Sequence, residues 1–263
     1  MKRYIVHKRR RGWDYLRDVL WVLVARDFKI RYKHSLLGIG WSLMVPITQY
    51  VVLFLVFNIL VPLNIPHFTT FLFTGFLPWT WFQTSLLAST TVVVENSEMV
   101  RTAGFPVALL PVISVIAQSI HFLLALPVLA VFLVNDGYHT SLPLLALPIV
   151  VAIELVLTLG LAYILASLQV KFRDVQYLVG IVLFLAFYLT PVFWSEDRIS
   201  EPWRSAMGWN PMAVIINAYR AILMKGEWPA LIPMLSVAAG SFAMLVIGYK
   251  AFSVAQDRFV EEF

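Results

Sequence analysis

The chain has 263 residues, of which 60% are hydrophobic and only 13% are charged, and it contains no cysteine. Soluble domains carry about 25% charged residues, so this composition excludes a water-soluble fold, and the cysteine count excludes disulfides, thiol catalysis and cysteine-ligated metals. The net charge of +5 is unevenly placed, because more than half of the 20 Lys and Arg residues lie in residues 1–33.

The first predicted element is a basic head followed by an amphipathic helix. No short apolar region with a cleavage site follows the head, so we do not expect a secretory signal. Beside so much apolar sequence, the Lys and Arg residues indicate an anchor on anionic lipid rather than nucleic-acid binding. Within 13–33 the apolar residues of one helical face are Trp13, Leu16, Leu20, Leu23, Val24 and Phe28. Such a helix lies in the membrane interface, either as a plain anchor or as a docking surface for a cytoplasmic partner.

Long charge-poor runs then predict the membrane spans. From His34 to Val94 the chain contains no Asp, Glu, Lys or Arg, and a charge at the centre of a bilayer costs about 3 kcal/mol. A span needs about 20 apolar residues, so this run predicts two helices, separated where Pro62 and Pro66 stop a helix. Each of four later charge-poor intervals of the sequence predicts one further span. The six predicted spans are 36–61, 68–93, 106–134, 142–168, 175–195 and 230–252.

The sequence therefore predicts an all-α, polytopic membrane protein in two parts. Residues 1–34 form the cytoplasmic basic head with its interface helix, and residues 35–263 form the six-span transmembrane domain. Lys and Arg mark cytoplasmic connections, and most of them lie in the head, the 94–105 and 169–174 connections and the tail. We expect both termini in the cytoplasm.

Two connections are not simple turns. In the segment 95–101, acidic residues near the start and Arg101 at the end suit the dipole of a short helix. Gly104 and Pro106 would stop that helix. A solvated turn fits the pattern equally well. The outer connection 196–229 is long and apolar, and Asn210, Pro211 and Gly226 supply the cap, first-turn proline and terminal glycine of a helix. We expect outer re-entrant or interfacial helices between spans five and six.

The motifs of catalysis are absent from the sequence. We find no His-Glu-x-x-His zinc motif, no Gly-x-Ser-x-Gly elbow, no paired membrane aspartates and no phosphate-binding loop. A membrane glycosyltransferase or acyltransferase is therefore disfavoured, and ATP hydrolysis by such a loop is excluded. Glu154 is the one acid inside a predicted span, which leaves an ion-coupled secondary transporter or flippase open as an alternative.

Aromatic residues are plentiful and form two stripes. Tyr50, Phe54 and Phe57 share a face of span one, and Phe184 and Tyr188 share a face of span five. Aromatic rings stack on the C–H faces of sugars and would let a sugar chain slide. Ordinary packing explains the same pattern, and the pattern alone favours packing.

Several segments, in this order and spacing, resemble the type-2 ABC exporter permeases of the branch that moves bacterial cell-surface polysaccharides. They are LLGIGWSLMVP at 36–46, FTGFLPW at 73–79, FRD at 172–174, LTPVFW at 189–194, Asn210-Pro211 and Tyr219-Arg220. The resemblance implies a homodimer that encloses a channel for a lipid-linked glycan. It also implies two copies of a separate ATPase, which would hold ATP and Mg; no cofactor, metal or nucleic acid is expected on this chain.

The resemblance also assigns roles to the patterns above. It implies an ATPase-coupling helix made of Glu95, Asn96, Ser97, Glu98, Met99 and Arg101. It implies a substrate channel lined by Tyr50, Phe54, Phe57, Phe184 and Tyr188, and contact of the amphipathic helix with the ATPase. The expected function is export of O-antigen across the bacterial cytoplasmic (inner) membrane, with capsule, teichoic acid, drug or lipid as alternative cargo.

Overall fold

The computed structural model describes residues 13–32, 40–139, 141–196, 199–201, 207–259 and 262. All regular structure in these residues is helical. The elements, in order, are α1 (Trp13–Tyr32), α2 (Gly40–Phe54) with its π-helical continuation η1 (Leu55–Leu60), α3 (Phe68–Glu95), α4 (Ser97–Val100), α5 (Leu109–Asn135), the 3₁₀ turn η2 (Leu142–Ala146), α6 (Leu147–Lys171), α7 (Val175–Leu189), α9 (Pro211–Arg220), the π-helical η4 (Ala221–Lys225) and α10 (Leu231–Gln256).

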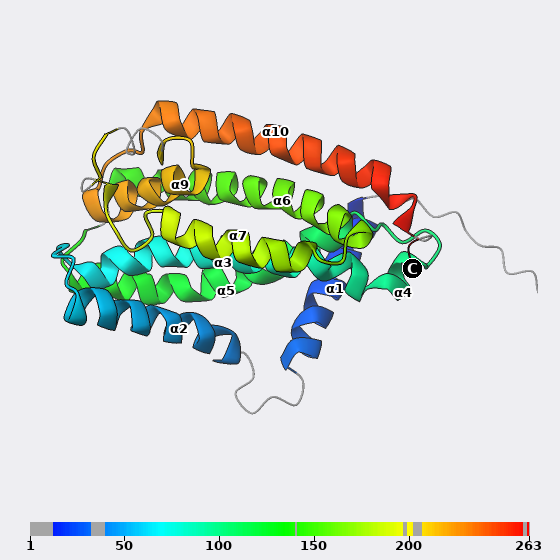
Figure 1. Ribbon diagram of the computed structural model, residues 1–263, viewed down its shortest axis with the longest axis horizontal. Helices are drawn as coiled ribbons and strands as arrows, with labels where there is room; N and C mark the ends of the chain where they lie inside the picture. The colour runs from blue at the N-terminus through cyan, green and yellow to red at the C-terminus, as the bar shows by residue number, and fades with distance from the viewer. Residues whose placement is uncertain are drawn as a thin grey trace, which may run out of the picture.

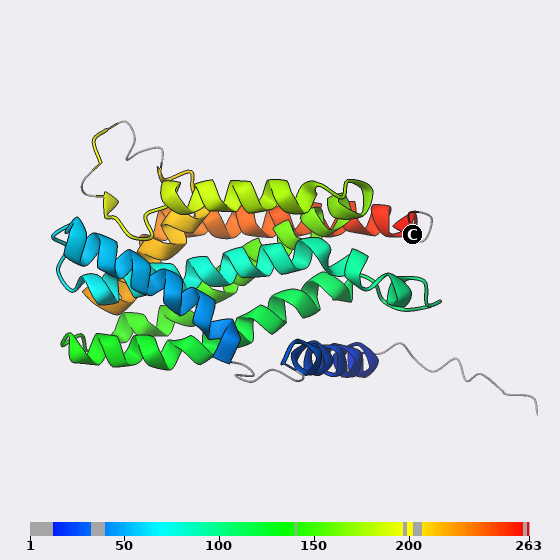
Figure 2. The same cartoon turned by 60° about the horizontal axis from the view of Figure 1, so that its bottom comes forward.

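The long helices α2, α3, α5, α6, α7 and α10 run along one axis of the molecule (Figures 1 and 2). Helix α1 crosses this axis at the end that also carries α4 and the C-terminus, which we call the α4 end. The opposite end, which we call the α9 end, carries α9 and the connections from η1 to α3 and from α5 to η2. Each predicted span corresponds to one of the long helices.

The helix boundaries follow local chemistry. Span one ends in η1, and α3 begins only at Phe68, so the predicted break at Pro62 and Pro66 is confirmed. Span five was predicted to reach 195, but α7 ends at Leu189. The reason is that Thr190 precedes Pro191 and adopts an extended backbone, as a residue before proline prefers.

The predicted helix at 13–33 is confirmed as α1, which packs against α5. Val24 is buried, and Leu20 and Leu23 are half-buried, whereas Trp21 and Val22 on other faces are exposed. The apolar surface of α1 is therefore wider than the single predicted stripe. The predicted boundary between head and transmembrane domain, at residue 34, lies outside the described residues.

In the residues that the structure describes, three helical segments are both long and apolar enough to cross a membrane: Leu109–Asn135, Leu142–Lys171 and Leu231–Gln256. Pro46–Leu60 and Val175–Leu189 are shorter apolar helices. These segments make the chain a multi-pass membrane protein. Helix α3 has 28 residues and no charge before Glu95, but its Thr, Ser and Gln residues make it less apolar than those three.

Helix α3 tolerates these polar residues because other helices surround it. It contacts α2, α5, α6, α7 and α9, and both Leu72 and Trp79 are almost completely buried. Thr74 and Thr90 donate hydrogen bonds to the carbonyls of Thr70 and Leu86, one turn earlier in the same helix. A buried hydroxyl that bonds to its own helix avoids most of the cost of losing water.

Helices α6 and α10 form the most extensive helix pair, and two glycines set their distance. A Cβ added at Gly160 would lie 2.7 Å from the backbone nitrogen of Leu245, and a Cβ added at Gly248 would collide with the carbonyl of Gly160. Small residues of this kind let helices approach closely in a membrane, where apolar burial alone gives little net drive to associate.

The substitution Gly160→Ala should therefore lower the melting temperature of the detergent-solubilised protein. Its methyl group meets backbone rather than a flexible side chain, and overpacking of this kind costs about 1–3 kcal/mol. Gly240→Ala on α10 is the matched control, because a Cβ there meets nothing within 4 Å. The control should melt at or above the wild-type temperature. Equal melting of the two variants would contradict the close approach of α6 and α10.

Candidate functional site

The segment that joins α3 to α5 forms a single turn of helix at the α4 end. Asn96 interrupts α3 with a non-helical backbone, and its carbonyl accepts hydrogen bonds from the amides of Met99 and Val100. Gly104 then takes a φ of 84°, which glycine adopts without steric cost. The sequence predicts a helical turn and a glycine stop here, and the structure contains both.

This turn is anchored to the bundle rather than free in solvent. Val100 is buried in an apolar cluster with Leu110 of α5, Tyr163 of α6 and Phe252 of α10. The Tyr163 hydroxyl also donates a hydrogen bond of 3.0 Å to the carbonyl of Ala108, just before α5. Helix α4 therefore packs on a cluster that residues of α3, α5, α6 and α10 share.

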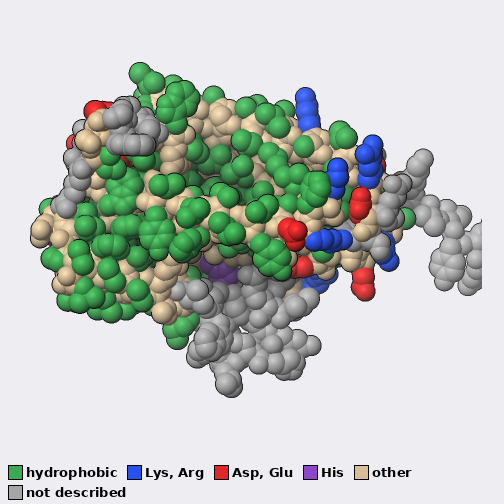
Figure 3. Space-filling model, in the orientation of Figure 1, with side chains coloured by type: hydrophobic (Ala, Val, Ile, Leu, Met, Phe, Trp, Pro, Cys, Tyr) green, Lys and Arg blue, Asp and Glu red, His purple; other side chains and the backbone are tan. Residues whose placement is uncertain are grey.

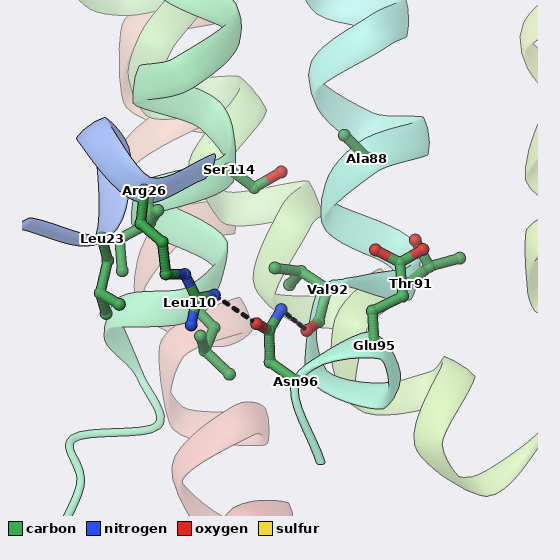
Figure 4. Close-up of a pocket in the computed structure, with 10 residues that line it drawn as sticks. Leu23, Arg26, Ala88, Thr91, Val92, Glu95, Asn96, Leu110 and Ser114 are labelled. Carbon is green, nitrogen blue, oxygen red and sulfur yellow. Dashed lines mark hydrogen bonds between the residues drawn. The ribbon is translucent and has the colours of Figure 1, made fainter. Parts of the chain in front are cut away.

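Helix α1 holds the same turn through Arg26. The Nη2 of Arg26 donates a hydrogen bond of 2.9 Å to Asn96 Oδ1, and Nη1 lies 3.4 Å from the sulfur of Met99. Asn96 Nδ2 in turn donates to the carbonyl of Val92, as Figure 4 shows. A cavity of about 160 Å³ lies beside these contacts, between α1, α3 and α5. The sequence analysis did not identify Arg26, because nothing local pairs two residues 70 positions apart.

The remaining predicted coupling residues face outward at this end. Glu95, Glu98 and Arg101 are exposed, and Asn96, Ser97 and Met99 are half-buried. Lys171, the last residue of α6, and Arg173, in the turn between α6 and α7, are exposed at the same end. On the face drawn in Figure 3, Lys and Arg side chains gather at this end, whereas hydrophobic side chains are spread over the rest of that face. The α4 end is thus a charged surface suited to a protein partner in water.

The turn between α6 and α7 is itself braced by one side chain. Gln169 Nε2 donates to the carbonyl of Arg173, and the amide of Gln176 donates to Gln169 Oε1. These two bonds span the turn from both sides, so the FRD segment at 172–174 has a defined backbone path.

The predicted channel residues fall into two groups. Tyr50, Phe54 and Phe57 on α2 and η1 are half-buried and pack against the core of the bundle. The Tyr50 hydroxyl donates to the carbonyl of Thr69 at 3.2 Å. Phe184 and Tyr188 on α7 are 58% and 48% exposed and contact each other edge to face.

One aromatic residue that the stripes did not include joins the two groups. The ring of Phe193 stacks on Phe57 at 4.7 Å between centroids and lies 5.9 Å from Tyr188. A continuous aromatic layer therefore runs from η1 across to the exposed face of α7. In the sequence, Phe193 is marked by its place in the LTPVFW segment. Its contact with Phe57 of span one cannot be read from the sequence and is seen in the tertiary structure.

At the α9 end, the capped helix α9 contacts α3, α6 and α10. Asn210 caps α9 by accepting hydrogen bonds from the amides of Met212 and Ala213, and Gly226 ends η4 with a φ of 66°. The predicted cap and terminal glycine are confirmed. The other half of the predicted outer helical pair falls partly on 197–198 and 202–206, outside the described residues.

Two adjacent residues fasten α9. The Tyr219 hydroxyl donates a hydrogen bond of 2.9 Å to Glu154 Oε2 on α6. Arg220 is buried, donates to the carbonyls of Pro191 and Val192 at 2.6 and 2.7 Å, and lies 3.6 Å above the ring of Phe71 on α3. Gly75 gives the guanidinium room, since a Cβ there would lie 2.7 Å from Arg220 Nη2.

Residues 18–224 match the family of ABC-2 type transporters. The chain belongs to this family. An ABC-2 transporter is the membrane subunit of an ABC exporter rather than its ATPase, and it works with an ATP-binding subunit. In this ABC-2 transporter, the α4 end is a charged surface on which Glu95, Glu98 and Arg101 are exposed.

Known relatives align over almost the whole transporter. The O-antigen export system permease protein RfbA of Klebsiella pneumoniae is 31% identical over 248 residues, which cover 94% of this chain and 95% of the relative. RfbA of Myxococcus xanthus is 34% identical over 247 residues, covering 93% and 95%. The polysialic acid transport protein KpsM of Escherichia coli is 19% identical over 255 residues, covering 94% and 97%.

Substitutions of the buried Glu154 and of its partner Tyr219 test whether Glu154 has a structural role or couples transport to protons in this ABC-2 transporter. Tyr219→Phe removes the donor to a fully buried carboxyl group and should cost about 1–3 kcal/mol of stability. Glu154→Gln keeps a carbonyl acceptor for Tyr219 and should melt close to wild type in detergent. Transport by Glu154→Gln at the wild-type rate would exclude proton coupling through this residue. Loss of transport with unchanged melting would instead support the ion-coupled alternative.

Proposed function

We propose that this chain is the permease subunit of an ATP-driven exporter that moves a lipid-linked cell-surface polysaccharide, O-antigen, across the bacterial cytoplasmic membrane. The observation that carries the proposal is the match to the RfbA permeases at 31–34% identity over nearly the full length of both chains. The match to KpsM at 19% makes a capsule-type polysaccharide the second candidate cargo.

We infer a six-span topology with both termini and the α4 end in the cytoplasm. The spans are α2 with η1, α3, α5, η2 with α6, α7 and α10. Lys and Arg flanking spans favour the cytoplasmic side, and Arg101, Lys171, Arg173, Lys250 and Arg258 all lie in connections or helix ends at the α4 end. Helix α1 lies across the bundle axis, which suits a helix in the plane of the interface.

We propose that two copies of the chain pair with two ATPase subunits, which hold the ATP and Mg. The coupling helix is α4 with its flanks, comprising Glu95, Asn96, Ser97, Glu98, Met99 and Arg101. Closure of the ATPase dimer would push on the exposed Glu95, Glu98 and Arg101. The buried Val100 and the Arg26 contact would then carry that push into four helices and into α1.

The glycan path in this proposal lies between the two copies. Phe184 and Tyr188 present exposed rings on α7, and Phe57 supports them from within the same copy through Phe193. Tyr50 and Phe54 pack against the core of the bundle. Rings offer sugars broad contact surfaces and few fixed hydrogen bonds, so a chain can advance without being trapped. Supporting rings that pack tightly keep the exposed rings in place.

The double substitution Glu98→Ala with Arg101→Ala should abolish export and leave membrane insertion unchanged. Both side chains are exposed on the coupling helix, so their removal alters the contact with the ATPase and not the fold. Surface polysaccharide would be measured in cells that lack the native gene and express each form at equal level. Normal export by the double variant would contradict the coupling assignment.

Arg26→Ala should reduce the glycan exported per ATP hydrolysed by about two- to fivefold, because an exposed charged contact contributes about 1 kcal/mol at most. The substitution removes the contact that Asn96 and Met99 make with α1 through Arg26. Arg17→Ala is the matched control, because Arg17 is exposed on the same helix and pairs with the adjacent Asp18. Equal coupling ratios for the two variants, measured in reconstituted complexes, would show that α1 does not position α4.

A further inference from the structure

A second, larger cavity lies at the α9 end. Its volume is about 780 Å³, within the range of roughly 300–1,000 Å³ found for small-molecule sites. It is bordered by the first turn of α3, by α9 and η4, and by the start of α10. Lys225, Glu227 and Trp228 border it and are exposed, so the cavity opens to the surface. None of the predicted channel residues lines it.

One face of α9 and η4 forms a wall of this cavity. Six of the seven lining residues on these elements recur at the spacing of a single helical face, and they are Val214, Asn217, Ala218, Ala221, Met224 and Lys225; the seventh is Arg220. The opposite face, with Ile215, Ile216 and Tyr219, is buried in the bundle. The sequence of α9 thus directs a half-buried amide, Asn217, toward the cavity while the other face anchors the helix.

The wall is held rigidly from behind. Arg220 and Tyr219 fasten α9 to α3, to α6 and to the segment after α7 through the bonds described above. Arg220 uses its Nη groups on the carbonyls of Pro191 and Val192. Arg220 therefore fixes α9 in place, and its positive charge contributes to the electrostatic potential of the cavity. A rigid wall favours binding, because the protein loses little conformational entropy when a ligand binds.

The lining chemistry selects among ligand classes. Among the liners that the structure describes, Arg220 and Lys225 are balanced by Glu196 and Glu227, so the charges of these four residues sum to zero, whereas a phosphate site needs a surplus of cations. An acyl chain needs an apolar lining without buried polar groups to desolvate. Aromatic faces beside amide and carboxylate groups instead match a sugar, whose C–H face stacks while its hydroxyls form hydrogen bonds.

Two aromatic residues supply those faces. Trp228 is 58% exposed at the edge of the cavity, and Tyr138 lines it from the connection between α5 and η2. Burial raises the pKa of Tyr138, and the nearby Asp136 carboxylate adds to the rise. The phenol therefore stays protonated at neutral pH and can donate a hydrogen bond to a sugar oxygen.

We propose that this cavity binds a short neutral sugar segment of the exported glycan at the outer face of the membrane, with Asn217 and Trp228 as the main contacts. The inference rests on the proposed function and its orientation, and adds a glycan contact separate from the aromatic channel. A binding site at the exit would hold the emerging chain and oppose its return.

The test uses the complete permease–ATPase complex in lipid nanodiscs. The probe is neutral O-polysaccharide, released from its lipid by mild acid and taken from the bacterium that encodes the chain. Binding is measured by calorimetry for wild type, Asn217→Ala and Trp228→Ala. Each substitution should weaken binding about tenfold, since each removes a buried hydrogen bond or a stacked ring. Trp228→Phe, which retains a ring, should restore most of the affinity.

Trp209→Ala is the matched control, because Trp209 is 91% exposed near the same helix and does not line the cavity. It should bind like wild type. Wild-type affinity in both cavity variants, or no binding of the probe by wild type at millimolar concentration, would overturn the proposal. Stronger binding of a glycerol-phosphate oligomer than of the neutral probe would also overturn it, in favour of an anion site.

Export in cells separates this inference from the proposed function. If deletion of the gene leaves surface polysaccharide unchanged, the proposed function fails. If export requires the chain but Asn217→Ala and Trp228→Ala bind and export as wild type does, with unchanged melting temperatures, only the cavity assignment fails.

Discussion

Helix α3 contacts α2, α5, α6, α7 and α9, and this central position constrains both ends of the molecule. Near its start, Phe71 and Gly75 receive the guanidinium of Arg220 from α9. At its finish, Asn96 leads directly into α4. A single helix of 28 residues therefore connects the α9 end with the α4 end. In the proposed mechanism, movement at one end of α3 would be transmitted to the other, because close-packed interiors deform little.

Several polar groups inside this bundle use a neighbouring group in place of the missing water, whereas the buried hydroxyls of Ser85, Ser89 and Ser241 have no hydrogen-bond partner in the described residues. Threonine hydroxyls use the carbonyls of their own helix, Arg220 uses the carbonyls released where α7 ends, and Tyr219 bonds to Glu154. The carbonyls of Pro191 and Val192 need partners because the Thr190-Pro191 pair breaks the helix. The helix break and the buried arginine thus satisfy each other, because the Arg220 guanidinium donates to the carbonyls of Pro191 and Val192.

The two ends of the molecule differ in chemistry in a way that suits a transporter driven by a partner. The α4 end exposes charged side chains around a helical turn that is firmly packed underneath. The α9 end has a balanced, partly aromatic cavity around a fastened helix. Between them, the aromatic layer from Phe57 through Phe193 to Tyr188 reaches the exposed face of α7. In the proposed mechanism, force enters at the first end and glycan leaves at the second.

Features that depend on neighbours in the chain could be predicted from the amino-acid sequence alone. Charge-free runs located the helices, Pro62 and Pro66 separated the first two, and Asn210 and Gly226 bounded the outer helix, because hydropathy, proline geometry and capping act within a few residues. Three contacts became visible in the three-dimensional fold alone: Arg26 bonds Asn96, Arg220 lies over Phe71, and Phe193 joins two aromatic groups. These partners lie far apart in the sequence, and many other partners would satisfy the same side chains. The choice among them is made by packing, which depends on the whole bundle at once.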